Sequence, residues 1–272
     1  LWKSVGKAVW DGAVMDAKRK RKYRWTGQEM LVSYSSPLIK TIHGKKHLLC
    51  LMRQGLVSLN PQTGEVYFKY WFKSRTHDSV NAARPVVIGD KIFLSAAYNM
   101  GSVLLQVKKE GKDYNVLWRN RKNLLAHWST PIHVDGYIYG FSGRHEKGGE
   151  LCCINLKTGK REWATTGFNG QLNDLEPDPQ TGEIRDKKSK EIIPFPFFGR
   201  GSLIRVGKEL IILGERGTLA LVTINPKKYE EVSRTSYKQI RHPVWTAPVL
   251  AHKRLYLRSE NHLLCLDVKE KK

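Results

Sequence analysis

One stretch near the middle of the chain reads Asn155-Leu156-Lys157-Thr158-Gly159-Lys160-Arg161-Glu162-Trp163, directly after the apolar run Leu151-Cys152-Cys153-Ile154. The Thr-Gly pair is typical of a tight turn, because Gly takes a positive φ without strain. Upstream, the turn residues Asp135-Gly136 precede a second apolar run, Tyr137-Ile138-Tyr139-Gly140-Phe141. Apolar alternation with a period of two is the pattern of a β-strand. This part of the chain therefore predicts consecutive short strands, the last of which ends in an aromatic residue.

The same unit recurs along the chain with a spacing of about 46 residues, and periods of roughly 20 to 50 residues mark repeat architectures. Each copy opens with a small or polar residue and Pro, followed by an apolar alternation, a Gly turn and a second apolar run. The opening prolines are Pro37, Pro85, Pro131 and Pro248, and Leu203 takes this place in a weaker copy. The wider gap before Leu203 indicates an insertion of different composition.

Four short strands in a unit of this length are typical of a β-propeller blade. The sequence carries no convincing helical stripe with caps, so we expect an all-β chain, a β-propeller of four-stranded blades forming a single domain over residues 1–272. The expected blades lie near residues 30–72, 78–119, 126–164, 200–235 and 244–268, with an insertion at 164–200.

The start of the chain leaves two possibilities open. Leu1-Trp2-Lys3 is similar to the expected outer strand Leu117-Trp118-Arg119, so it could close the last blade. We favour the alternative that inner strands are missing before Leu1, because the chain lacks an initiator Met. We then expect these five blades to be a fragment of a propeller with about six to eight blades.

The turn Asn155-x-x-Thr158-Gly159-x-x-x-Trp163 resembles the blade motif of the pyrroloquinoline-quinone-like propellers. This superfamily includes quinoprotein alcohol dehydrogenases and the non-catalytic propeller lipoprotein of the outer-membrane assembly machinery. The resemblance covers about residues 30 to 268, although a second copy, at Thr63-Gly64, has Phe68 in place of Trp. It implies a bacterial, extracytoplasmic protein, either periplasmic or extracellular.

The resemblance also raises an enzymatic alternative, a quinone-dependent alcohol or sugar dehydrogenase with pyrroloquinoline quinone and calcium as cofactors. Catalytic members carry a vicinal disulfide beside the quinone, but Cys152 and Cys153 lie inside an apolar strand, where neighbouring side chains point to opposite faces. We therefore expect both cysteines to be structural. No Cys-x-x-Cys metal motif is present.

The insertion contains four acidic residues, which are Asp174, Glu176, Asp178 and Glu183. Their spacing does not match an EF-hand loop, and Pro177 and Pro179 stand where the chain would have to wrap around an ion. We expect a solvated acidic loop, with a calcium site as the alternative. Our prediction is no catalytic residue, no metal and no cofactor.

The chain has 47 Lys and Arg against 25 Asp and Glu, a formal net charge of +22, and 40% of its residues are hydrophobic. The apolar fraction is too high for a disordered polycation. No stretch approaches about 18 uncharged apolar residues, so we expect no transmembrane segment. Most of the excess charge lies at turns, where it favours attraction to an anionic surface.

One basic run is dense enough to contact a polyanion directly. Its cationic residues are Lys18, Arg19, Lys20, Arg21, Lys22 and Arg24. The alternative is a solvated loop, because like charges repel one another. We expect no specific nucleic-acid binding, since no nucleic-acid-binding motif accompanies the run.

The openings of the repeats are candidate ligand-binding positions, because the first strand of each propeller blade lines the central channel. The residues expected at the channel mouth are Ser35, Asn81, Arg84, His127, Trp128, Arg200 and Trp245. Such a set suits a small anionic or aromatic ligand, and blade packing is the alternative role.

From these observations we expect a non-catalytic propeller scaffold that binds a protein or a cell-envelope polymer through loops on one face. The insertion would contribute Phe195, Phe197 and Phe198, which could cap the channel mouth or meet the partner. A quinone-dependent dehydrogenase and a polyanion-binding protein remain the alternatives.

Overall fold

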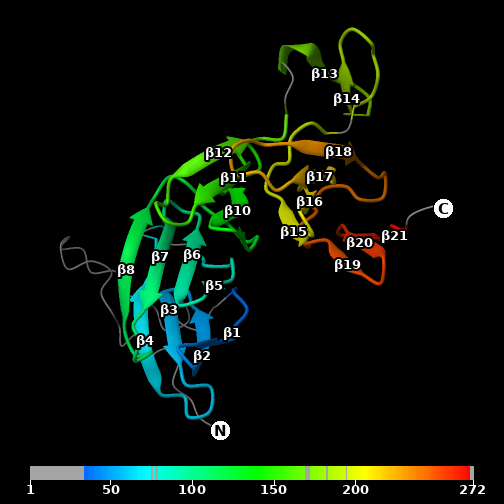
Figure 1. The fold of residues 1–272 in the computed structure, drawn as a ribbon. Helices are drawn as coiled ribbons and strands as arrows, with labels where there is room; N and C mark the ends of the chain where they lie inside the picture. Colours follow the sequence, from blue (N-terminus) through cyan, green and yellow to red (C-terminus); the bar gives the residue numbers. More distant parts are fainter. Residues whose placement is uncertain are drawn as a thin grey trace. The chain divides into compact units, whose positions relative to one another are not determined.

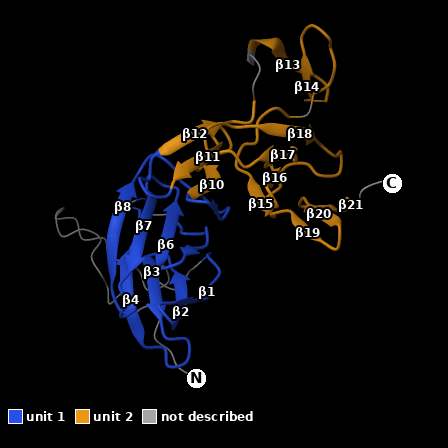
Figure 2. Cartoon of the chain, viewed as in Figure 1, with its two compact units in different colours: residues 1–136, 156–160 blue, residues 137–155, 161–272 orange. Residues whose placement is uncertain are grey.

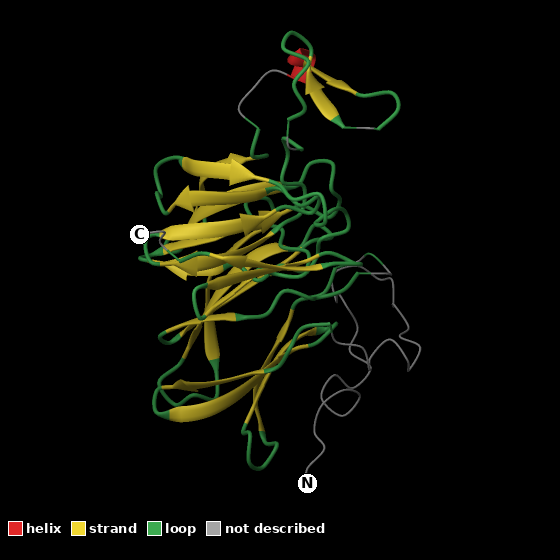
Figure 3. Ribbon diagram, turned by 90° about the vertical axis from the view of Figure 1, so that its right-hand side faces the viewer, coloured by secondary structure: helices red, strands yellow, loops and turns green. Residues whose placement is uncertain are grey.

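The computed structural model describes residues 34–74, 76, 79–168, 172–181, 183–193 and 195–269. Within these residues the chain forms 21 β-strands in six sheets and one 3-10 turn, η1 (Leu172–Asp174) (Figures 1 and 3). The prediction of an all-β chain built from four-stranded blades is confirmed. The chain divides into two compact units, residues 1–136 with 156–160 and residues 137–155 with 161–272 (Figure 2).

Unit 1 contains two four-stranded sheets in which consecutive strands pair antiparallel. The first sheet comprises β1 (Leu38–Ile42), β2 (Lys45–Leu51), β3 (Gly55–Leu59) and β4 (Val66–Trp71). The second comprises β5 (Val86–Ile88), β6 (Lys91–Ala96), β7 (Gly101–Val107) and β8 (Tyr114–Asn120). The unit also contains β9 (Ile132–Val134), the first strand of the third repeat.

The turn chemistry explains why these strands form hairpins. His43 and Gly44, between β1 and β2, both have positive φ, at 49° and 74°, and Asp135 and Gly136 repeat this at 46° and 85°. Two consecutive positive φ values define the two-residue hairpin turn whose twist matches that of the flanking strands. The sequence therefore sets the strand boundaries locally at these turns.

The core of unit 1 forms between its two complete sheets. β3 is buried along its whole length, as expected for an inner strand covered on both faces. One cluster joins the two sheets, and its buried members include Leu49, Leu51, Leu56, Phe72, Ile92, Leu94, Val103 and Leu105. The outer strand β8 is mostly exposed.

The Thr-Gly turn of the repeat receives an aromatic residue from the preceding repeat. Trp118 on β8 donates its indole N–H to the carbonyl oxygen of Leu156 at 2.8 Å. Gly159 has a φ of 68°, and a Cβ there would lie 2.7 Å from the Trp118 ring. The glycine is therefore needed both for the turn and for the close approach of the indole.

Unit 2 contains the other strands of the third repeat and two further sheets. The third repeat supplies β10 (Tyr137–Ser142), β11 (Glu150–Asn155) and β12 (Arg161–Thr165). The next sheet comprises β15 (Ser202–Val206), β16 (Glu209–Leu213), β17 (Leu219–Thr223) and β18 (Glu231–Thr235). The last has three strands in the described residues, β19 (Val249–Ala251), β20 (Arg254–Arg258) and β21 (Leu263–Asp267).

The segment between β12 and β15 is the inserted one, and it forms a small separate hairpin of β13 (Leu175–Pro177) and β14 (Ile184–Asp186) (Figure 1). Its end returns to the body of unit 2 through Phe198, which is fully buried against Phe141. A separate core cluster, with Leu213, Val244, Leu255 and Leu257 among its buried members, joins the last two sheets. The segment that follows the hairpin is thus anchored at Phe198, in the loop that precedes β15.

Candidate functional site

Two of the predicted channel-mouth residues are buried in unit 1 and bonded to backbone carbonyl groups. The Ser35 hydroxyl donates to Ala83 at 3.4 Å, and the Asn81 amide donates to Met52 at 2.9 Å and to Phe72 at 2.8 Å. Asn81 therefore ties the segment after β4 to the turn that follows β2. Neither side chain is open to a ligand.

The other three candidates in unit 1 have access to solvent. Arg84 is exposed, and its backbone N–H donates to the hydroxyl of Thr130 at 3.1 Å. Half-buried His127 places its Nε2 3.1 Å from the Tyr98 hydroxyl, with the two rings edge to face. Trp128 is also half-buried. The bond from Arg84 to Thr130 brings the openings of the second and third repeats together.

In unit 2 the structure joins the candidates Arg200 and Trp245 through Glu215, a residue that the sequence analysis did not single out. The indole N–H of Trp245 donates to Oε1 of Glu215 at 2.8 Å. The Arg200 guanidinium donates to both carboxylate oxygens, with Nε 3.0 Å from Oε2. Glu215 is fully buried, whereas Trp245 is 55% exposed. We call these three residues the Trp245 platform.

The β16–β17 turn that carries Glu215 is held on both sides. The Glu215 N–H donates to the carbonyl oxygen of Phe198 at 2.9 Å, and the Val244 N–H donates to that of Glu215 at 3.0 Å. In the same turn Gly217 has a φ of 95°, and a Cβ there would lie 1.8 Å from the carbonyl oxygen of Ile240. The sequence did carry one signal for this site: Glu215 is an acidic residue in the turn between two apolar strands of a strongly basic chain.

The electrostatics make Glu215 a positioning group. Burial alone would raise the pKa of its carboxyl, but hydrogen bonds from Arg200 and Trp245 outweigh burial and hold this pKa below its ordinary value. Glu215 is therefore ionised at neutral pH, and its negative charge is matched by Arg200. Nε2 of His242 lies 3.8 Å from Oε1 of Glu215. The Glu215 carboxylate, hydrogen-bonded by Arg200 and Trp245, therefore orients these two side chains and is not placed to act as a general acid or base.

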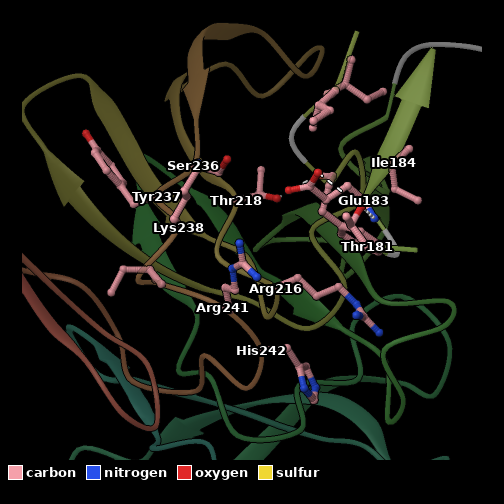
Figure 4. Close-up of a pocket in the computed structure, with 14 residues that line it drawn as sticks. Thr181, Glu183, Ile184, Arg216, Thr218, Ser236, Tyr237, Lys238, Arg241 and His242 are labelled. Carbon is pink, nitrogen blue, oxygen red and sulfur yellow. Dashed lines mark hydrogen bonds between the residues drawn. The ribbon is translucent and has the colours of Figure 1, made fainter. Parts of the chain in front are cut away.

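Beside the platform, a cavity of about 470 Å³ lies between the inserted hairpin and the loops that follow β16 and β18 (Figure 4). We call it the hairpin pocket. Its apolar lining comes mainly from Ile184, Ile192, Ile193, Phe195 and Ile240. The Thr218 hydroxyl donates to the Phe195 carbonyl at 2.7 Å, which fixes this part of the wall.

Charged side chains line the same pocket. Figure 4 shows Glu183 on the hairpin and Lys238, Arg241 and His242 along the loop after β18. Arg216 is paired with Glu146, with Nη2 3.0 Å from Oε2. The pocket thus combines an apolar wall with a predominantly basic edge.

A second cavity, of about 450 Å³, shares Phe195 and Arg216 with the hairpin pocket. The guanidinium carbon of Arg216 lies 4.9 Å from the centre of the Phe195 ring, so the two shared side chains contact each other. Phe197 and the backbone of several glycines complete the second cavity. Of the three phenylalanines singled out in the insertion, Phe195 and Phe197 therefore line cavities, whereas Phe198 is core.

The acidic residues of the insertion bond within their own hairpin. Asp178 accepts the N–H groups of Gln180 and Thr181 at 2.9 and 2.8 Å, and it pairs with Arg185 at 2.9 Å. Lys190 pairs with Glu176 at 2.7 Å. In the part of the chain that the structure describes, no group of three or more His, Cys, Asp or Glu is arranged to hold a metal ion.

Cys152 and Cys153 are free thiols, fully buried inside β11. Burial raises the pKa of each to about 12. Because neighbours in a strand face opposite sides of the sheet, the two thiols do not line one shared cofactor site. These residues do not fit the quinone site that catalytic members of the resembled superfamily build around a vicinal disulfide.

The basic run at Lys18, Arg19, Lys20, Arg21, Lys22 and Arg24 lies outside the described residues, as does Leu1-Trp2-Lys3. Polyanion contact by this run stays a prediction. Across the described ranges, no helix has the length and apolar character needed to cross a bilayer.

Comparison with known proteins assigns the repeat. Residues 5–165 match the model of the family described as "Outer membrane protein assembly factor BamB". A search of the curated proteins found no match. Among solved structures, the chain is similar to a computationally designed protein, Ika8, with 10% identity and a TM-score of 0.42 over 82% of this chain and 67% of that chain.

Proposed function

Since the chain belongs to the family of the outer membrane protein assembly factor BamB, we propose that it is a non-catalytic propeller scaffold that binds a protein partner in an extracytoplasmic compartment. The description of the family adds the expected setting, which is the assembly of outer membrane proteins. The proposal includes no redox cofactor and no catalytic residue.

The observation that carries the proposal is the Trp245 platform. Trp and Arg are the residue types most enriched among the energetically dominant residues of protein interfaces. Trp245 is 55% exposed while its indole N–H is held by buried Glu215. Because the ring is already oriented, Trp245 loses little side-chain entropy when a partner covers it.

The inserted segment extends this surface. Its exposed Ile192 and the Phe195 ring line the hairpin pocket, which is also lined by His242, three residues before Trp245. The His242 ring in turn lies 6.4 Å from the Trp245 ring. An exposed apolar group and an anchored Trp, with cations between them, have the composition of a protein-binding patch. A partner could therefore contact the insertion and the platform together.

Site-specific photocrosslinking tests this proposal. A photoreactive phenylalanine derivative at exposed Thr246, next to Trp245, should give one discrete product with an envelope protein in cells that secrete the chain. Trp245→Ala should remove most of that product. The matched control places the same group at Val232, which is 54% exposed on β18, the outermost strand of its sheet.

Three results would contradict the scaffold proposal. The first is no product from the Thr246 position, and the second is the same set of products from the Thr246 and Val232 positions. The third comes from reconstitution with pyrroloquinoline quinone and calcium: stoichiometric binding with dye reduction would favour a dehydrogenase. The identity of the crosslinked protein then tests the assembly setting separately.

A further inference from the structure

We propose that the hairpin pocket is a ligand site for a carboxylate carried by an apolar group. This inference goes beyond the proposed scaffold function, because it assigns a small ligand or a chain end to a cavity next to the Trp245 platform.

The apolar wall of the pocket favours a ligand with an apolar group. Ile192 is 53% exposed, whereas Ile240 at another part of the lining is 1% exposed. Ile184, Ile193 and Phe195 add further apolar surface. A ligand that covers Ile192 and reaches toward Ile240 would remove this surface from water, and such burial is the main source of affinity in small-ligand sites.

The basic edge of the pocket favours a ligand with a negative charge. Arg216 already has Glu146 as a partner, and Nε2 of His242 lies 3.8 Å from Oε1 of Glu215. By contrast, exposed Lys238 and Arg241 form no ion pair with any described residue. These two cations remain available to a carboxylate.

Glu183 is the acidic member of the lining, and its carboxylate accepts the hydroxyl of Thr181 at 3.3 Å within the hairpin. The lining therefore keeps a net positive charge. With Arg216 paired to Glu146, the two cations Lys238 and Arg241 against Glu183 leave one net positive charge, which one carboxylate matches. A polyanion such as a nucleotide would leave most of the isoleucine wall uncovered. A monoanion with an apolar body fits both features.

The volume limits the ligand further. A cavity of about 470 Å³ falls within the range of roughly 300 to 1,000 Å³ typical of small-ligand sites. A medium-length alkyl carboxylate or the last two residues of a peptide would fill it. These two sources share the chemistry that the pocket recognises, and the experiment distinguishes them.

Binding is measured by calorimetry on the full chain with two acid probes, decanoate and N-acetyl-Leu-Phe. Each is compared with its uncharged counterpart, decanol or the dipeptide amide. We expect at least one acid to bind with about one ligand per chain, and at least fivefold more tightly than its counterpart. Decanoate alone would identify a lipid-like ligand, and the dipeptide alone would identify a protein carboxyl terminus.

The variants separate this pocket from the general positive charge of the chain. Lys238→Gln combined with Arg241→Gln should weaken acid binding at least fivefold, and Ile192→Ser should weaken it by a similar factor. The matched control is Lys208→Gln with Lys227→Gln, which removes the same charge from exposed positions outside the pocket lining. All five residues are exposed, so these variants should fold.

The inference is overturned if neither acid binds, if acids and uncharged counterparts bind equally, or if the control variant weakens binding as much as the pocket variant. Loss of the Thr246 crosslink with acid binding intact would contradict the scaffold proposal alone. Absence of acid binding with the crosslink intact would contradict the pocket alone.

Discussion

Trp245 and Glu215 share a hydrogen bond of 2.8 Å in which one partner is largely exposed and the other is fully buried. The same carboxylate binds the guanidinium of Arg200, just before β15. One buried charge thus holds two loops that are distant in sequence. Its removal would affect the stability of unit 2 and the orientation of the exposed indole at the same time.

Replacing Glu215 should destabilise the protein, because Arg200 would lose this carboxylate partner in a site where its side chain is only 19% exposed. We expect Glu215→Ala to lower the free energy of unfolding by about 3 kcal/mol. Glu215→Gln should cost less, since an amide oxygen still accepts a hydrogen bond. Urea unfolding followed by tryptophan fluorescence measures both.

Lys228→Gln is the control for this series, because Lys228 is exposed and lies 3.8 Å from its partner Glu230. We expect it to leave the free energy of unfolding nearly unchanged. If Glu215→Ala costs no more than Lys228→Gln, the carboxylate does not have the stabilising role assigned to it.

The Thr-Gly turn gives a second prediction. Gly159→Ala places a methyl group 2.7 Å from the Trp118 ring at a φ of 68°. We expect a loss of about 2 kcal/mol, from backbone strain and overpacking together. Gly136→Ala is a matched control, because Gly136 has a φ of 85° but nothing within 4 Å of its Cβ position.

The control variant should show strain alone, at about 1 kcal/mol. Thermal unfolding of both variants against the wild type gives the comparison. Equal losses would mean that the close approach of Trp118 to Gly159 adds nothing, and that the glycine is required only for its positive φ.

The repeat could be predicted from the sequence because its signals are local. A turn such as Asp135-Gly136 sets the backbone φ, and the apolar run that follows it predicts the strand β10 without any long-range information. The docking of Trp118 on the next turn was not predicted. It joins residues 38 positions apart, and no short pattern encodes such a contact.

In the candidate site, too, the local signals were predicted from the sequence and the long-range contact was not. Arg200 and Trp245 were identified from their places at repeat openings, but Glu215, which joins them, is 15 and 30 residues away along the chain. Ser35 and Asn81 also lie at repeat openings, yet their side chains are buried and bonded to carbonyl groups. Repeat position alone does not distinguish a loop-facing side chain from a structural one.

The cysteines give a prediction that bears on the quinone alternative. Cys152 and Cys153 are buried with pKa values raised to about 12, whereas Cys265 is exposed. Because the thiolate is the reactive form, we expect Cys265 to react fast with a thiol reagent near pH 8 and Cys152 and Cys153 not to react. Cys50 is half-buried and its pKa is raised, so it should react slowly.

Unfolding in denaturant should then expose all 4 cysteines of the chain to the reagent. Cys265→Ser is the control variant, and it should remove the fast phase alone. A denatured protein that titrates only two thiols would contradict the free state of Cys152 and Cys153 and would revive the vicinal disulfide of the quinone enzymes.

His47 is a buried titratable group in unit 1. Its side chain is fully buried on β2, its Nδ1 lies 2.8 Å from the Ser58 hydroxyl, and its Nε2 has no hydrogen-bond partner among the described residues. Burial, together with the charges of Lys45 and His43, lowers the pKa of His47 from 6.5 to about 4. The folded protein therefore keeps this ring neutral over a range in which the unfolded chain protonates it.

The sign of the pH effect follows from linkage. Below about pH 6.5 the unfolded state binds a proton that the folded state does not, so stability declines as the pH falls and levels off below the folded pKa. The His47 contribution to the free energy of unfolding should fall by up to about 3 kcal/mol across this window. Urea unfolding at several pH values gives the wild-type curve.

His47→Gln should flatten that curve, even though the variant is less stable at neutral pH, whereas His262→Gln at an exposed site should leave its slope unchanged. Because the titrating carboxylates are common to all three proteins, the difference between the wild-type and His47→Gln slopes isolates this ring. Parallel curves for the two would mean that His47 is protonated as readily in the folded protein as in the unfolded chain.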